Sequence, residues 1–404
     1  VVDVLTAKDI PGVNDISPTG RDDEPVLADG IVQFYGQPIF CVIAETREQA
    51  RRACKRAKIE YEELPFVVDV DGLDVEKDKL VTPNLTLRRG DSTDAIRNAP
   101  RRLKGQVRNG GQDHFVLEGQ ISMAIPGEDG DVTVYCSTQH PSEVQHMVGH
   151  ALGVPSHSVT IEVRRMGGGF GGKETQSNQF AALAAIAAKR LRRAVKIRPD
   201  RDDDMTATGK RHCFLIDYEV GFNFAARCGF SSDLSGPVTD RALFHCDNTY
   251  FYPAVTAVSA PFYTNTVSNT AFRGFGGPQG VIGAERIIDE IAIATGKDPL
   301  EIRRRNFYGT ADRNVTPYHQ TVEDNIIHRI FDELERDADY WGRRREIRAF
   351  NNNSRYIRRG LAMTPVKFGI SFTATQYNQA GALVHVYTDG SIHLNHGGTE
   401  MGQG

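Results

Sequence analysis

The sequence contains few cysteines, and none are paired as metal sites require. Six cysteines are scattered through 404 residues, and no two of them stand in a C-x-x-C arrangement. The cysteines of this chain therefore cannot form a zinc ribbon or hold an iron–sulfur cluster. Isolated cysteines in a chain of this length are typical of reduced, mostly buried thiols. We therefore expect a cytoplasmic protein.

The sequence also lacks long apolar runs and a strong charge of either sign. No uninterrupted apolar stretch reaches the roughly 20 residues that a membrane-spanning helix needs. The net charge is −4 and the sequence pI is about 6.3, so nothing attracts the chain generally to nucleic acid or to a membrane. We expect neither as a partner.

The length and composition indicate a multidomain globular protein. Apolar residues make up 40% of the chain and charged residues 25%, as in ordinary globular proteins, and 404 residues exceed one compact core. We predict an α+β fold that begins with a small, incomplete α/β domain at 1–66. A linker at 67–112 follows, then a mixed α+β domain at 113–320 and the incomplete start of another at 321–404.

Strand and helix signals support this division. Residues 37–44 form an apolar run of strand length, and Thr46 is placed to cap a helix in which Ala50, Ala53 and Ala57 recur at helical spacing. Further strands are expected at 121–125, 132–136, 159–163, 194–197, in a strand-rich region at 213–256 and in a hairpin at 382–394. Helices are expected from Pro141 to the Gly153 region and at 175–191, 284–294 and 322–349.

One strand pair conflicts with turn geometry. Residues 214–222 and 224–228 both resemble strands, yet only Asn223 separates them. A tight hairpin needs at least two loop residues. This region is therefore either one long strand or a hairpin from which residues are missing.

Three glycine-rich loops are the most informative feature of the chain. They span residues 167–174, 273–279 and 396–404, and the first two carry Phe170 and Phe275 among their glycines. Glycine lets main-chain N–H groups approach a ligand closely and adopts positive φ without steric cost. Three such backbone cradles, with glutamines and aromatic rings between them, predict a large, polar, anionic cofactor.

The first loop also fits two phosphate-binding patterns. It satisfies G-x-x-x-x-G-K, but Glu174 stands where a triphosphate site needs a Ser or Thr hydroxyl, and a carboxylate would repel phosphate. The dinucleotide pattern G-x-G-x-x-G fits better, because Asp200 follows the next strand, but it leaves the other two loops without a role. His146 and His150 are spaced as in zinc peptidases but lack an intervening glutamate, so we assign no metal there.

Four further residues carry little information when taken singly. Gln139 precedes the start of a helix, so a helix-capping role is enough to account for a polar residue there. Arg241 could equally be an ordinary surface arginine in a salt bridge. Phe372 and Thr373 would pass as strand residues.

Together, however, these segments resemble the molybdenum-binding part of the xanthine dehydrogenase and aldehyde oxidase family, on its xanthine dehydrogenase branch. The similar strings occur in order over the whole chain, at 111–119, 137–143, 167–175, 269–277 and 398–404. The resemblance implies a hammerhead-like N-terminal domain followed by molybdopterin-binding domains. It also implies a molybdenum–molybdopterin cofactor.

The resemblance assigns residues to the cofactor. Gln139, Phe170 and Arg273 would line the molybdenum, the first through its amide and the others largely through their backbone. Gly169 belongs to the same cofactor-binding set. Hydrogen bonds to the molybdopterin would come from Gly171, Gly402 and Gln403.

The resemblance also implies a purine substrate, hypoxanthine or xanthine, oxidised to urate with oxygen derived from water. Glu174 and Arg241 would serve catalysis by pairing with ring nitrogens and by stabilising charge on the purine oxygen. Phe275 and Phe372 would clamp the flat ring. Thr373 and Ala374 would line the same slot, whereas Gln376 replaces an apolar residue of the family.

Other parts of the enzyme are implied but not found in this sequence. The family's general base is a glutamate in a Gly-Glu-Pro setting, and no such motif occurs here. We therefore expect a chain truncated at both ends, inactive alone, and completed by the remaining half of the molybdenum subunit. Iron–sulfur clusters and FAD would lie on a partner or another segment, in a dimer of the complete assembly. An aldehyde or N-heterocycle oxidase of the same family, or an inactive cofactor-binding fragment, remains the alternative.

Overall fold

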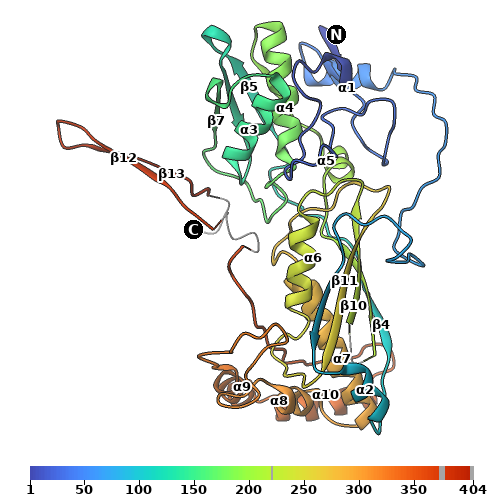
Figure 1. The fold of residues 1–404 in the computed structure, drawn as a ribbon. Coiled ribbons are helices and arrows are strands. Elements are labelled where there is room, and N and C mark those ends of the chain that lie inside the picture. Colours follow the sequence, from blue (N-terminus) through green and yellow to red (C-terminus); the bar gives the residue numbers. More distant parts are fainter. Residues whose placement is uncertain (220–221, 373–377, 401–404) are drawn as a thin grey trace.

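The computed structural model describes residues 1–219, 222–372 and 378–400 (Figure 1). Its helices and strands are mixed along the chain, as predicted for an α+β protein. In the N-terminal region β1 (Asp3–Thr6) pairs antiparallel with β2 (Phe40–Ile43), and α1 (Arg47–Cys54) follows. Thr46 caps α1 as expected, because its hydroxyl accepts a hydrogen bond of 3.2 Å from the N–H of Gln49. Short 3₁₀ turns occur at Ala7–Asp9, Glu128–Gly130 and Ser156–Ser158.

A four-stranded sheet supports the first glycine loop. Its order is β7-β6-β5-β8, formed by β5 (Ser122–Pro126), β6 (Val132–Cys136), β7 (Val159–Glu162) and β8 (Val195–Ile197). Only the β6–β7 pair is parallel. The sheet packs on α3 (Pro141–Leu152) and α4 (Ser177–Leu191) through a core of alanines and branched residues. Leu5, Val26 and Leu27 join this core, so the N-terminal region packs against the same two helices.

A five-stranded sheet forms the second large body of the molecule. Its order is β3-β11-β10-β9-β4, formed by β3 (Leu85–Arg89), β4 (Gly105–Asn109), β9 (Cys213–Tyr218), β10 (Phe222–Gly229) and β11 (Val255–Tyr263). β10 and β11 are parallel and the other pairs antiparallel. Two helices, α6 (Ser235–Phe244) and α7 (Gly277–Thr295), pack together and against strands of this sheet (Figure 1). The shorter helix α2 (Ser92–Asn98) connects β3 to β4, and α5 (Arg201–Ala207) lies between β8 of the four-stranded sheet and β9.

A helical group completes the body. It consists of α8 (Pro299–Asn306), α9 (Ile327–Asp337) and α10 (Tyr340–Asn353), whose core contains Tyr250, Phe307 and Phe331. Beyond it, β12 (Ala382–Val386) and β13 (Ile392–His396) pair in the predicted hairpin. All residues of the two strands are exposed, and the hairpin projects away from the rest of the chain (Figure 1).

Several expected elements differ from the observed ones. Residues 67–112, expected to be a linker, contribute β3 and β4, which form the two edges of the five-stranded sheet. Their many charged residues suit edge strands, which keep one side exposed to solvent. Asn223, the one residue between the two expected strands, lies in β10 opposite Asp217 of β9. Because β9 and β10 pair antiparallel, the region is not one long strand.

Two helical expectations also need correction. The strand-rich region at 213–256 contains α6, because Gly236 and Pro237 lie in the first turn of a helix rather than in a loop. The single helix expected at 322–349 is split into α9 and α10 at Asp339, whose φ is +43° and whose side chain caps α10. Among the helices of the described chain, none has the length and apolar character that crossing a bilayer would require.

Candidate functional site

Backbone hydrogen bonds bring the three glycine-rich loops together. The N–H of Arg273 in the second loop donates to the carbonyl oxygen of Phe170 in the first, at 2.9 Å. The N–H of Met166, just before the first loop, donates to the carbonyl oxygen of Glu400 in the third, at 3.0 Å. Segments more than 100 residues apart therefore meet at one place.

Gln139 lies between the first and the third glycine-rich loops. It follows β6 and precedes the start of α3 at Pro141. Its backbone N–H donates to the carbonyl oxygen of Lys173 at 2.8 Å, and its side-chain Oε1 accepts from the N–H of Gly171 at 2.8 Å. The hydroxyl of Thr399 in the third loop donates to the Gln139 carbonyl at 3.4 Å. Gln139 thus contacts the first and third loops at once.

The glycines of the first loop are required by close packing. A Cβ on Gly169 would lie 2.5 Å from Oε1 of Gln139. Gly171 has a φ of +97°, and a Cβ there would lie 2.7 Å from the carbonyl carbon of Ala271. Phe170 between them has a φ of +53° and is 44% exposed. The loop therefore presents an aromatic side chain outward while its backbone packs against neighbouring segments.

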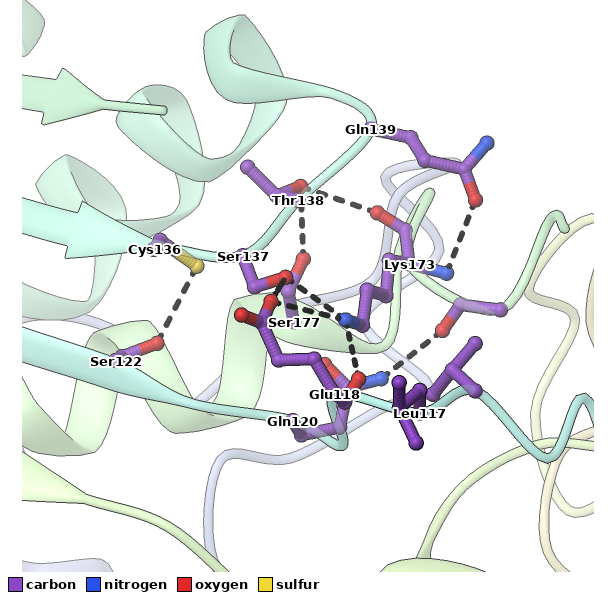
Figure 2. A network of polar contacts seen from close by, with 12 residues as sticks. Leu117, Glu118, Gln120, Ser122, Cys136, Ser137, Thr138, Gln139, Lys173 and Ser177 are labelled. Atoms are coloured by element: carbon purple, nitrogen blue, oxygen red, sulfur yellow. Dashed lines mark hydrogen bonds and ion pairs between the residues drawn. The ribbon is translucent and has the colours of Figure 1, made fainter. Parts of the chain in front are cut away.

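A buried lysine joins this loop to two other segments. Figure 2 shows the Lys173 amine between Glu118 and Ser137. Burial lowers the pKa of Lys173, and the Glu118 carboxylate counteracts that shift. Sequence reasoning assigned no role to Lys173 or Glu118. The sequence signal that could have pointed to Lys173 is its position as a charged residue inside a glycine-rich loop. The triphosphate-binding pattern accounts for a lysine at this position, but the rest of that pattern does not fit.

Glu174 follows the lysine and is held in an acidic surrounding. Burial, with a smaller contribution from the nearby Asp233 carboxylate, raises its pKa to about 7, and His140 acts in the opposite direction. Asp233 itself is buried and accepts hydrogen bonds from the hydroxyls of Thr175 and Thr270, each at 2.7 Å. Near neutral pH Glu174 is thus divided between a proton-donating and a proton-accepting form.

Arg241 lies on α6 and is 4% exposed. Its two terminal nitrogens donate to the carbonyl oxygens of Gly369 and Ser371. The guanidinium carbon is 5.8 Å from the ring centre of Phe275 in the second glycine loop and 5.2 Å from that of Phe368. Burial lowers the pKa of Arg241. This arginine is therefore a buried residue that holds the 368–372 segment, rather than a solvated surface charge.

Two of the expected substrate-clamping rings lie together. The ring centres of Phe275 and Phe372 are 5.0 Å apart with an interplanar angle of 51°. Asn378 fixes the backbone of Phe372 with two hydrogen bonds of 2.8 Å, one to its N–H and one to its carbonyl. The rings form a tilted aromatic pair beside Arg241.

The expected site residues therefore fall into two groups joined by the second glycine loop. One group surrounds Gln139 and contains Gly169, Phe170, Gly171 and Arg273; the other contains Arg241, Phe275 and Phe372. Within the described ranges, Glu174 and Arg241 share no hydrogen bond or ion pair. Thr373, Ala374, Gln376, Gly402 and Gln403 lie outside the described residues.

Buried donors near these loops have unused hydrogen-bonding capacity. Arg211 is 8% exposed, donates to the carbonyl oxygen of Arg273 at 3.0 Å and stacks over Phe272 at 3.9 Å. Its other terminal nitrogen and the Nε of Arg241 are buried without an acceptor among the described residues. Unpaired buried donors are costly in a folded protein. The Arg211 donor, together with the bare glycine backbone of the loops, fits a polar, anionic group such as molybdopterin, whereas the Arg241 donor lies in the second group.

Comparisons with known proteins identify the family of this chain. The family model described as "Molybdopterin cofactor-binding domain" matches residues 74–307, and a second one of that description matches 333–404. The model described as "Aldehyde oxidase and xanthine dehydrogenase, a/b hammerhead domain" matches residues 1–65. The chain therefore belongs to the xanthine dehydrogenase and aldehyde oxidase family. The predicted α+β fold with a hammerhead-like N-terminal domain is confirmed, as is the molybdopterin cofactor at the level of the family.

Individual relatives are consistent with this assignment. Xanthine dehydrogenase of Dictyostelium discoideum is 43% identical over 411 residues, and xanthine dehydrogenase/oxidase of Gallus gallus is 43% identical over 413. Each match covers 99% of this chain but only 30% of the relative. Among solved structures, aldehyde oxidoreductase from Desulfovibrio gigas aligns with a TM-score of 0.79 at 23% identity, covering 97% of this chain and 45% of the other. Quinoline 2-oxidoreductase from Pseudomonas putida aligns over 87% of this chain and 48% of the other, at 22% identity and a TM-score of 0.74.

Proposed function

We propose that this chain is part of a xanthine dehydrogenase, a molybdenum hydroxylase that oxidises hypoxanthine and xanthine to urate with oxygen derived from water. The observation that carries the proposal is the convergence of three glycine-rich loops: Gln139 contacts the first and the third, and Arg273 of the second donates to Phe170 of the first. The similarity to curated xanthine dehydrogenases supports the substrate class. Because the chain spans about 30% of those relatives, the activity belongs to the whole protein.

The first group of residues would hold the cofactor. The Gln139 amide and the backbones of Phe170 and Arg273 would line the molybdenum, and Gly169 and Gly171 would bring main-chain groups close to the pterin. Gly402 and Gln403 are proposed for the pterin on the resemblance alone. When bound, the molybdenum would supply two-electron redox chemistry and oxygen transfer to the ring carbon.

The second group would bind the purine together with Glu174. In its protonated form Glu174 donates a hydrogen bond to a purine ring nitrogen, and in its ionised form it accepts one. Arg241 supplies positive charge beside the purine oxygen. It donates a hydrogen bond to that oxygen either from its Nε, which has no acceptor among the described residues, or from a terminal nitrogen that gives up one of its two backbone carbonyl acceptors. Phe275 and Phe372 flank the flat ring, and Thr373 and Ala374 complete the slot.

The remaining proposals concern the complete assembly. We infer a domain division at 1–66, 113–320 and 321–404, in which residues 67–112 also supply edge strands to the five-stranded sheet. The general-base glutamate lies on the remaining half of the molybdenum subunit. Iron–sulfur clusters and FAD lie on a partner or another segment, and the assembly is a cytoplasmic dimer.

The test is substrate oxidation by the whole purified protein. Molybdenum content, xanthine oxidation and oxidation of an aromatic aldehyde are measured on one preparation. Molybdenum near one atom per chain with xanthine as the better substrate supports the proposal. A clear preference for the aldehyde or for another N-heterocycle would identify a different oxidase of the family. Protein that binds the cofactor and turns over neither substrate would be a non-catalytic binding protein.

A further inference from the structure

Lys173 occupies the centre of the polar network in Figure 2. Its side chain is fully buried, at 0% exposure. Its amine donates to the carbonyl oxygen of Glu118 at 2.6 Å and to the hydroxyl of Ser137 at 2.8 Å, and lies 3.4 Å from the Glu118 carboxylate. These three acceptors match the three N–H groups of an ammonium. The charge is therefore fully coordinated by protein groups.

The two residues that receive these hydrogen bonds lie on different segments that both reach the first glycine loop. The N–H of Glu118 donates to the carbonyl oxygen of Gly167 at 3.1 Å, at the start of the loop. Ser137 lies two residues before Gln139, at the end of β6. A buried charge is a costly way to fill space, because an apolar residue of similar volume is often as stable. What the ammonium adds is a fixed distance between these two segments and the loop.

The backbone of Lys173 holds Gln139 as well. The Lys173 carbonyl accepts from the N–H of Gln139 at 2.8 Å and from the hydroxyl of Thr138 at 3.1 Å. The Lys173 N–H lies 3.4 Å from Oε1 of Gln139, which the Gly171 N–H also approaches. Both ends of Gln139 therefore depend on where Lys173 sits.

We propose that Lys173 is a positioning residue that orients the carboxamide of Gln139 toward the molybdenum–pterin. The inference rests on the proposed function. With Oε1 turned to the N–H groups of the loop, Nε2 of Gln139 points away from the network (Figure 2). It is thereby the donor that the loop presents to the bound group. Loss of the buried ammonium would leave Ser137 and Glu118 joined only by the hydrogen bond from the Ser137 hydroxyl to the Glu118 carboxylate, and would let Gln139 change its orientation.

The first test uses cofactor-free protein and needs no activity. Amide hydrogen exchange, read by mass spectrometry, is compared for the whole protein and its Lys173→Met variant. Methionine keeps the length of the side chain and removes the three donors. We expect exchange about tenfold faster in peptides covering residues 137–140 and 167–174, with a folded thermal transition retained. The control is Lys196→Met, at an exposed position on β8 of the same sheet, which leaves these peptides unchanged.

Unchanged exchange in both peptides of Lys173→Met would overturn the proposal. If that variant does not fold, Ser137→Ala decides the question, because it leaves the lysine in place and removes one of its acceptors, together with the hydroxyl that donates to the Glu118 carboxylate. Faster exchange in the 167–174 peptide of Ser137→Ala supports the proposal, and wild-type exchange there overturns it. These readouts do not depend on whether the wild-type protein takes up molybdopterin, so a failure of the proposed function is recognised separately.

The second test uses protein loaded with cofactor. We expect Lys173→Met to lower kcat for xanthine on the order of 10²-fold while KM changes little, because a misplaced group near the reacting atoms affects turnover more than binding. The spectroscopic signature of the molybdenum should shift in the same variant. Wild-type kcat together with a wild-type spectrum would contradict the inference.

Discussion

The backbone N–H of Gly171 donates a hydrogen bond of 2.8 Å to the side-chain Oε1 of Gln139. The two residues are 32 positions apart, one in a glycine loop and the other between a strand and a helix. This hydrogen bond ties the most distinctive backbone of the chain to the amide that we assign to the metal. The first two predictions concern its two ends.

Replacing Gly171 by alanine should destabilise the fold. The φ of +97° is unfavourable for any residue with a Cβ, and that atom would lie 2.7 Å from the carbonyl carbon of Ala271. Strain of this kind costs about 1–3 kcal/mol, and backbone atoms cannot move aside as a flexible side chain can. The free energy of unfolding, measured by denaturant titration, should fall by at least that amount. Gly110→Ala is the control, since nothing lies within 4 Å of a Cβ there; equal stability of the two variants would count against this account of the loop.

Replacing Gln139 by leucine should reduce the molybdenum content and leave the fold intact. Leucine preserves the volume but removes the acceptor for the Gly171 N–H and the donor proposed for the metal. Oε1 also accepts from the Lys173 N–H, so two hydrogen bonds are lost at about 1 kcal/mol each, which leaves a domain of ordinary stability folded. Metal analysis per polypeptide is the measurement. Gln145→Leu is matched, because Gln145 is also half-buried and its amide donates to the Val159 carbonyl at 2.7 Å; equal metal content in both variants would remove Gln139 from the site.

The elements that support the site could be predicted from local signals in the sequence. Thr46 caps α1, Pro141 opens α3 and Gly153 ends it with a φ of +67°. Each of these signals depends on the conformational preference of one residue, which is readable without tertiary contacts. Helix α6 was missed because Gly236 and Pro237, typical of turns, lie inside its first turn. These residues are helical because α6 packs against β11 and α7. Those contacts join segments that are distant in the sequence, so a short stretch of sequence does not reveal them.

The site itself could be predicted only in part. The composition of the loops indicated an anionic ligand, but their convergence depends on contacts between segments more than 100 residues apart, such as Arg273 with Phe170. The resemblance to a family supplied that expectation. Neither source indicated that Arg241 would hold the carbonyls of Gly369 and Ser371. The part played by Lys173 was equally hidden, because Glu118 and Ser137 are brought to it by the tertiary fold.

Glu174→Gln should change the pH dependence of xanthine oxidation. Burial raises the pKa of Glu174 to about 7, so the carboxyl is protonated below that pH and ionised above it. If the protonated form donates to a purine ring nitrogen, kcat/KM falls as pH rises through about 7. Glutamine donates at every pH, so the variant should keep its activity at low pH and lose this fall. Glu162→Gln, at an exposed position on β7, should retain the wild-type profile; the same profile in Glu174→Gln would contradict the assigned role.

Arg241→Ala should distinguish purines from aldehydes. The guanidinium is buried beside Phe275, where a positive charge acts strongly on a developing negative charge. Loss of one such donor costs on the order of 10²–10³ in rate, so kcat/KM for xanthine should fall by that factor. An aromatic aldehyde without the purine oxygen should be affected much less. Arg286→Ala, at an exposed position on α7, is the control, and equal losses for both substrates would show that Arg241 acts only by holding residues 369–371.

Asp233 should make the stability of the fold depend on pH. Burial raises its pKa from 3.8 to about 6, although hydrogen bonds from Thr175 and Thr270 oppose the shift. Because the folded state binds this proton more tightly than the unfolded state, the resulting stability is complete below pH 3.8 and is lost as pH rises through about 6. The free energy of unfolding of wild type minus that of Asp233→Asn should therefore decrease by roughly 1–3 kcal/mol between pH 4 and 7. In this difference, the pH-dependent contributions of the carboxyl groups that both proteins share cancel. Asp217→Asn, at an exposed position on β9, tests whether the loss of any negative charge has the same effect. A difference that stays constant, or that follows the Asp217→Asn control, would show that the Asp233 carboxyl is not held in its protonated form by the fold.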